Sequence, residues 1–310
     1  MRQLIINGDD FGLTEGVNHA IVEAHQAGVL TSATLMAQGS EFDEAVRLSA
    51  SVPSLSVGCH VVLIGGSPLL PTAQVPSLLG SEGSFRRTWG SFAAAALGGR
   101  LSAQEIEAEA IAQIRKLQQA GVPVTHLDTH KHTHLFPQVL QPLLRAAEAC
   151  GVGAIRNPFE PVQWGLLGKN IRVWERWLGI GVLRAFSGTF RRMVADAGVM
   201  SPDGSLGIAS TGLWNAPQFH SMIESVPQGT WELVCHPGYN DAQLHAMPTR
   251  LRESRQKELE ILTSPEIPAL LAKNGIHLIS YRDWYTSRHD RAGQRVSQST
   301  QHSSGAAPTS

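Results

Sequence analysis

The sequence predicts an α/β protein in which parallel strands are joined by crossover helices. Short apolar runs alternate with helical patterns roughly seven or eight times along the 310 residues, without an internal repeat or linker. No Gly-x-Gly-x-x-Gly motif follows the first strand, so a dinucleotide-binding open sheet loses its main support. Two architectures are built from such units, a (β/α) barrel and an open doubly wound sheet, and both stay open at this point.

The predicted strands are short apolar runs that lead into polar residues. The first, QLIIN at residues 3–7, is followed by two adjacent aspartates. The last, within HLISYRDW, closes the core. The further extended segments are expected at residues 31–37, 55–63, 122–128, 153–158, 207–210 and 231–238.

The predicted helices have apolar residues at helical spacing and recognisable ends. Ser102, with Glu105 three residues later, has the pattern of a capping box. Pro137 opens another helix and Gly151 closes it. Helices are expected at residues 15–28, 41–51, 102–121, 137–151, 170–197, 218–225 and 249–262.

Composition and charge exclude several classes of protein. The chain is 42% hydrophobic and 16% charged with a net charge of -1, so no general attraction to nucleic acid is expected. Three widely separated cysteines provide neither a disulfide framework nor a metal-binding pair, which favours a reducing, cytoplasmic setting. No signal peptide and no apolar stretch of membrane-span length is found.

A single domain is expected to cover residues 1–287, with a long helical insertion at about 160–205. The remaining residues, 288–310, are small and polar and cannot bury a core, so this tail is predicted to be disordered.

Polar side chains stand at the ends of five predicted strands. In a barrel these strand ends meet at one rim, which is where active sites lie. Adjacent strand residues point to opposite faces, so Asp9 and Asp10 need not collide: one can bind a cation while the other receives a proton. The other groups are His60, the segment THLDTHKHTH, the pair Arg156-Asn157, and His236.

The segment THLDTHKHTH carries the densest signal. Its histidines share one parity with Asp128, so an extended chain would place all of them on one face. At most two histidines are expected to bind one ion, and the others would orient ligands or contact substrate. Two histidines and one carboxylate leave open positions on a metal, which is the pattern of a catalytic site.

Four segments resemble the signatures of the YdjC-like carbohydrate deacetylases: NGDDFGLTEGVNHAI, GCHVVLIGGSPL, THLDTHKHTH and HPG. This family includes chitooligosaccharide deacetylases and a branch associated with hopanoid biosynthesis. The resemblance runs from about Leu4 to Trp284. It implies a (β/α) barrel of the glycoside hydrolase/deacetylase type, distorted or seven-stranded forms included. It also implies a carbohydrate N-deacetylase, with a lipid-linked (hopanoid) N-acetylglucosamine among the candidate substrates.

The resemblance also implies roles for individual residues. Asp9 matches the presumed catalytic base, and His236 matches a histidine that could act as acid. The family's run HHHVH reads HKHTH here, so Lys131 replaces a histidine. The matching metal ligands are Asp10, His60 and His130.

The expected cofactor is a divalent metal ion. The family is usually assigned Mg²⁺, whereas mixed nitrogen and oxygen ligands also suit Zn²⁺, manganese or cobalt. Arg156, His132 and Asp128 are predicted to bind substrate, and a structural ion pair is an open alternative for Arg156.

Two other classes of function stay open. One is a metal-dependent phosphoesterase or amidohydrolase, and the other is a non-enzymatic protein that binds a sugar or lipid. A two-carboxylate glycosidase is disfavoured because adjacent aspartates cannot face each other across a sugar.

The expected partner is a small-molecule or lipid-linked amino sugar, with no nucleic acid. Residues 170–192 interleave arginines with aromatic residues, which predicts either peripheral contact with a membrane or packing on the barrel. The oligomeric state stays open, with a homodimer among the alternatives.

Overall fold

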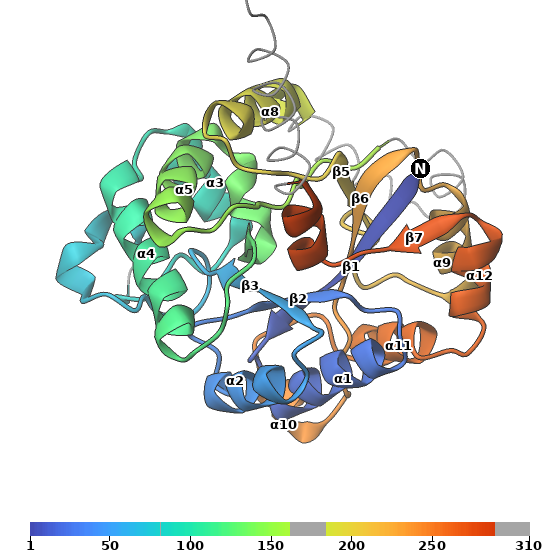
Figure 1. Ribbon diagram of the computed structural model, residues 1–310. Coiled ribbons are helices and arrows are strands. Elements are labelled where there is room, and N and C mark those ends of the chain that lie inside the picture. Colours follow the sequence, from blue (N-terminus) through green and yellow to red (C-terminus); the bar gives the residue numbers. More distant parts are fainter. Residues whose placement is uncertain (81, 162–183, 289–310) are drawn as a thin grey trace, which may run out of the picture.

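The protein forms a curled parallel sheet wrapped by helices (Figure 1). The computed structural model describes residues 1–80, 82–161 and 184–288. All strand pairings in this part of the chain are parallel, and the sheet runs in the order β4-β3-β2-β1-β6-β5, with β7 beside the first residues of β1. The strands are β1 (Arg2–Phe11), β2 (Ser32–Leu35), β3 (Ser56–Val61), β4 (Leu127–Thr129), β5 (Gly204–Leu206), β6 (Gly229–Cys235) and β7 (Ile276–Leu278).

An irregular segment closes the ring between β4 and β5. Ile155 bridges Leu127 of β4, and Ala154 bridges Met200 just before β5. The Ser205 backbone N–H donates to the Phe159 carbonyl 3.1 Å away, which continues the contact beside β5. The sheet is therefore a distorted (β/α) barrel, and the predicted fold class is confirmed.

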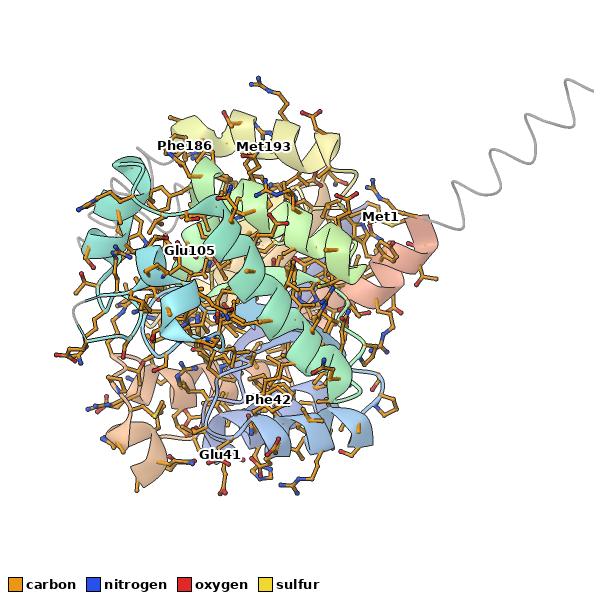
Figure 2. All side chains as sticks on the ribbon, turned by 90° about the vertical axis from the view of Figure 1, so that its left-hand side faces the viewer. Met1, Glu41, Phe42, Glu105, Phe186 and Met193 are labelled. Carbon is orange, nitrogen blue, oxygen red and sulfur yellow. The ribbon has the colours of Figure 1, made fainter. Side chains whose placement is uncertain are left out.

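Helices cover the outside of this barrel (Figure 1). Figure 2 shows Met193 on α8 at the top of one face and Phe42 on α2 at the bottom. The helices are α1 (Glu15–Gln26), α2 (Phe42–Ser51), α3 (Trp89–Leu97), α4 (Ala103–Gln119), α5 (Pro137–Cys150), α8 (Ser187–Asp196), α9 (Ala216–Glu224), α10 (Ala242–Ala246), α11 (Glu253–Leu262) and α12 (Ile267–Lys273), with short 3₁₀ turns η1 (Thr72–Gln74), η2 (Pro76–Leu78), η3 (His130–Leu135) and η4 (Arg184–Phe186).

Local chemistry accounts for several element ends. At α4 the Ser102 hydroxyl accepts from the Glu105 backbone N–H, as predicted, but the Glu105 carboxylate binds the Ser77 N–H instead of completing the box. The segment predicted to run on as a strand after β7 ends at Leu278. There the Ser280 hydroxyl accepts from the Asp283 backbone N–H and starts a helix over 281–288.

Other predicted extents need correction. Only the end of the 122–128 segment pairs within β4, and 153–158 contributes isolated bridges rather than a strand. The strand expected at 207–210 lies earlier in the chain, at β5, because the residues that pair with β6 are Gly204–Leu206. Helix α3 was not predicted, since its alanine-rich sequence lacks a clear apolar period.

Most of the predicted helical insertion and the tail lie outside the described residues, as does most of the arginine- and aromatic-rich segment. Where the segment is described, Phe190 of α8 is buried against Phe159, which agrees with packing on the barrel. Arg191 and Arg192 are exposed. In residues 1–80, 82–161 and 184–288, no helix is both long enough and apolar enough to cross the bilayer.

Gly58 of β3 allows a test of how closely the barrel interior is packed. A methyl group there would lie 2.6 Å from the His126 ring and from the His126 carbonyl oxygen. We expect Gly58→Ala to lower the free energy of unfolding by about 1–3 kcal/mol, measured by urea denaturation. Gly90→Ala in α3, where the methyl meets nothing within 4 Å, is the control. Equal stability of the two variants would contradict the packing described.

Candidate active site

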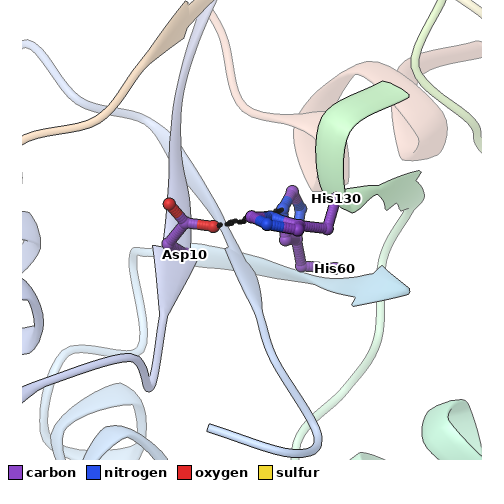
Figure 3. A group of neighbouring side chains, drawn as sticks. All are labelled: Asp10, His60 and His130. Carbon is purple, nitrogen blue, oxygen red and sulfur yellow. Dashed lines mark hydrogen bonds and ion pairs between the residues drawn. The ribbon is translucent and has the colours of Figure 1, made fainter. Parts of the chain in front are cut away.

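Three side chains from different segments converge at the rim formed by the C-terminal ends of the strands. Asp10 comes from β1, His60 from β3, and His130 from η3, directly after β4 (Figure 3). Asp10 Oδ1 lies 3.1 Å from His130 Nδ1 and 3.4 Å from His60 Nε2, and the two histidine nitrogens are 3.3 Å apart. The predicted ligand set is thus brought together in space.

The spacing of these atoms fits a common metal ion. Nitrogen and oxygen ligands about 2.0–2.2 Å from zinc lie roughly 3–3.5 Å from one another in ordinary coordination geometries. The Asp128 carboxylate is 2.7 Å from His60 Nδ1, so it can take the N–H there and leave the Nε2 lone pair facing the group. Two nitrogens and one oxygen suit zinc, manganese or cobalt.

Asp10 reaches this position through an unusual backbone conformation. Its φ is 65°, in the left-handed region that aspartate tolerates better than most residues, and the pairing of β1 with β2 shifts register between Gly8 and Phe11. The expected alternation of Asp9 and Asp10 onto opposite faces is therefore wrong. Both carboxylates come within 4.8 Å of the ring nitrogens of His60.

The histidine-rich segment also departs from the extended chain that was predicted. Lys131 and His132 have φ values of 56° and 54°, so η3 turns sharply after Thr129. This turn sends His130 to Asp10. His134 instead turns to the Thr129 hydroxyl, 2.6 Å from its Nδ1. The single face predicted for the segment does not form.

Arg156 occupies the barrel interior beneath the rim and is 0% exposed. Its guanidinium makes a two-point pair with Asp9, at 2.8 and 2.6 Å. It also lies 2.7 Å from Asp128 and 2.8–2.9 Å from Glu232. These contacts occupy its N–H groups, so the open alternative, a structural ion pair, replaces the predicted substrate contact. The equally buried Asp128 is likewise out of reach of a substrate.

The charge at the site favours a cation. Four buried carboxylates outnumber the two guanidinium groups that contact them, because Arg156 binds Asp9, Asp128 and Glu232 while Arg255 binds Asp10. Buried charge needs compensation. A second group of possible ligands, Asp9, His60 and Asp128, already has the Arg156 guanidinium between its carboxylates. At Asp10, by contrast, Arg255 binds Oδ2 and leaves Oδ1 facing His60 and His130.

The pKa of His60 reflects the same imbalance. Burial by itself would lower the pKa of this ring, but Asp128, assisted by Asp10 and Asp9, raises the pKa to about 10. In the absence of a metal ion the ring therefore holds a proton at neutral pH. A divalent cation would supply this positive charge in its place.

Asp9 and His236, the residues predicted to act as base and acid, lie side by side. His236 Nε2 lies 3.9 Å from Asp9 Oδ2. Burial would raise the pKa of Asp9, but Arg156 lowers that pKa below its usual range, so the carboxylate stays ionised. Burial lowers the pKa of His236 to about 4 against the opposing effect of Asp9, so the ring is neutral. Its Nδ1 is buried without a hydrogen-bond partner among the described residues.

Several supporting residues were missed by sequence reasoning. Glu232 could have been found from the sequence, since it is a lone carboxylate in the apolar strand WELVC and is expected on the same face of the strand as His236. Asn7 donates to Asp9 at 2.9 Å and stands on the same strand. Arg255 and Glu258 come from α11, and nothing in the local sequence marks them. Glu258 accepts the His236 backbone N–H at 2.6 Å.

His132 is the predicted substrate-binding residue that keeps surface exposure. His132 is half-buried within η3, and its Nδ1 has no hydrogen-bond partner in the described part of the chain. Lys131 is exposed, and its ammonium lies 3.8 Å from the place where a side chain on Gly65 would begin. These two residues border the site on the solvent side.

Comparisons with known proteins agree over nearly the whole chain. Residues 3–273 match the model of the YdjC-like protein family. A carbohydrate deacetylase of Geobacillus stearothermophilus is 35% identical over 92% of this chain and 98% of its own length. A chitooligosaccharide deacetylase of Yersinia pestis is 31% identical over 91% of this chain and 99% of its own length. A crystal structure from Enterococcus faecalis V583 is 26% identical, with a TM-score of 0.71 over 91% of this chain and 98% of that one.

Metal binding should release a proton. Because the folded, metal-free protein holds a proton on His60 up to a pKa of about 10, binding through Nε2 must displace it. We expect the affinity for Mn²⁺ to rise about tenfold per pH unit between pH 7 and 9, with about one proton released. Calorimetry in two buffers of different ionisation enthalpy measures both. His19→Gln on α1 is the control, and a pH-independent affinity would contradict the assignment.

Proposed function

Because the chain belongs to the YdjC-like protein family, we propose that it removes the acetyl group from an N-acetylated amino sugar with the help of a divalent cation. The predicted class, a carbohydrate N-deacetylase, agrees with the relatives named above. The observation that carries the metal-dependent proposal is the triangle of Asp10, His60 and His130, with the Asp9–His236 pair beside it.

Amide hydrolysis requires an activated water molecule and stabilisation of the negative charge that develops on the carbonyl oxygen. A divalent cation held by Asp10, His60 and His130 would lower the pKa of a water molecule and polarise the carbonyl. The carboxylate of Asp128 would keep the His60 ring in the required orientation.

One proton must pass from the attacking water to the departing amine. Asp9 accepts it as general base, and His236, 3.9 Å away, delivers it to the nitrogen. Arg156 keeps Asp9 ionised and fixes both of its oxygens, so the carboxylate cannot rotate away. The resting ring of His236 is neutral and therefore free to receive the proton before passing it on.

The finer substrate proposal is an N-acetylglucosamine linked to a lipid, and the finer metal proposal is Mg²⁺ or Zn²⁺. Exposed Arg191 and Arg192 of α8 are suited to contact an anionic membrane surface, which would bring a cytoplasmic enzyme to such a substrate. Sedimentation with liposomes, with and without anionic lipid, tests the membrane contact. An absence of binding in both cases would contradict the proposed membrane contact.

Mass spectrometry tests the reaction. We expect the purified protein to remove one acetyl group from N,N′-diacetylchitobiose or from an N-acetylglucosaminyl lipid, and a chelator to abolish the loss. The substrate that the protein prefers of these two identifies the substrate class. Hydrolysis of aryl phosphates without any loss of acetyl would support the phosphoesterase alternative instead.

Replacement of Asp9 separates catalysis from metal binding. Asp9→Asn removes the proton acceptor, so we expect turnover to fall by about 10²–10⁴-fold while Mn²⁺ still binds. Asp10→Asn is the matched comparison on the neighbouring residue, and there Mn²⁺ affinity itself should be lost. Full function in the Asp9 variant would favour the non-enzymatic, sugar- or lipid-binding alternative.

A further inference from the structure

A closed circuit of contacts inside the barrel joins the last described helix to Asp9. On one side, Arg156 pairs with Asp9 and donates from Nε to Glu232 Oε1 at 2.9 Å. The other oxygen of Glu232 accepts from the Tyr281 hydroxyl at 2.7 Å. Tyr281 belongs to the helix at 281–288 and is 0% exposed.

The circuit returns to Asp9 along its other side. The Tyr281 ring stacks on His126, with ring centroids 3.8 Å apart and an angle of 11° between the planes. His126 Nε2 lies 3.0 Å from Asn7 Oδ1, and Asn7 Nδ2 donates to Asp9 Oδ1 at 2.9 Å. The carboxylate of Asp9 therefore receives donors from both arms of the circuit.

The hydrogen bonds fix the proton positions in this circuit. An ionised Asp9 accepts only, so the amide of Asn7 must turn its Nδ2 to Asp9 and its oxygen to His126. The Nε2 of His126 must then carry the ring proton. Burial lowers the pKa of His126 well below its ordinary value, which keeps the ring neutral, and the contact with Asn7 selects the tautomer.

We propose that Tyr281 is a positioning residue of the active site, acting through Glu232 and Arg156 on one arm and through His126 and Asn7 on the other. This inference rests on the proposed function. Without the Tyr281 hydroxyl, Glu232 Oε2 would be a buried acceptor with no donor, so Glu232 would move toward another donor. Arg156 would follow Glu232, and Asp9 would lose its two-point pair. Tyr281 lies beyond residue 273, where the match to the family model ends.

The test compares Tyr281→Phe with Tyr285→Phe, which removes a hydroxyl from the same helix at a half-buried ring that packs against Gly153. Because Tyr281→Phe keeps the stacked ring, the fold should survive. We expect its kcat on N,N′-diacetylchitobiose to fall about tenfold, with KM and Mn²⁺ affinity within about twofold of the wild type. Glu232→Gln, which weakens the bond to Arg156, should show the same split.

Two outcomes would overturn the proposal. In one, Tyr281→Phe keeps the kcat of Tyr285→Phe. In the other, Mn²⁺ affinity falls together with kcat, which would indicate general destabilisation rather than an effect on Asp9.

A measurement on the metal-free protein separates this proposal from the proposed function. The ring N–H proton of His126 should give a downfield NMR resonance, assigned by its loss in His126→Gln. Tyr281→Phe should shift this resonance and Tyr285→Phe should not, whether or not the protein deacetylates a sugar. An unchanged resonance in Tyr281→Phe would exclude the circuit, and a wild-type protein without deacetylase activity would exclude the proposed function alone.

Discussion

The pairing of one buried guanidinium with three carboxylates is the constraint on which this structure depends. Asp9 stands on β1, Asp128 on β4 and Glu232 on β6, while Arg156 comes from the irregular segment that closes the ring. The same ion pairs therefore hold the barrel closed and set the position of Asp9, the proposed base. Loss of one partner of a buried ion pair typically costs about 3–5 kcal/mol because the remaining charge is left uncompensated. A change to one of these residues would therefore affect both the stability of the barrel and the position of Asp9.

His60 stands on the boundary between two electrostatic environments. Its Nδ1 faces inward to Asp128, which Arg156 also neutralises, and its Nε2 faces outward to Asp10 and His130. The inner environment has its cation in the form of a guanidinium. In the outer one, Arg255 binds Oδ2 of Asp10, and Oδ1 faces the two imidazole rings. The His60 ring contacts both groups, so the position of the inner ion pairs also fixes the position of this ring at the rim, where a metal ion would bind.

Much of this arrangement could be predicted from the sequence, because the strand-end rule depends only on the order and period of the elements. Apolar runs alternating with helical patterns predicted parallel strands with crossover helices, and the family resemblance implied the barrel. Polar residues at the C-terminal ends of strands predicted where the side chains meet. The left-handed backbone at Asp10 and at Lys131 could not be predicted, since tertiary contacts hold it in place. The role of Arg156 stayed open, because the sequence around an arginine does not distinguish one that binds substrate from one that binds buried carboxylates.

Bridges and a single hydrogen bond between 154–159 and 200–205 close the barrel, rather than a regular strand. The three candidate metal ligands come from β1, β3 and the turn directly after β4, on the regular side of the ring. The closing segment supplies none of them. It acts on this group only through Arg156, which contacts the Asp128 carboxylate that faces His60.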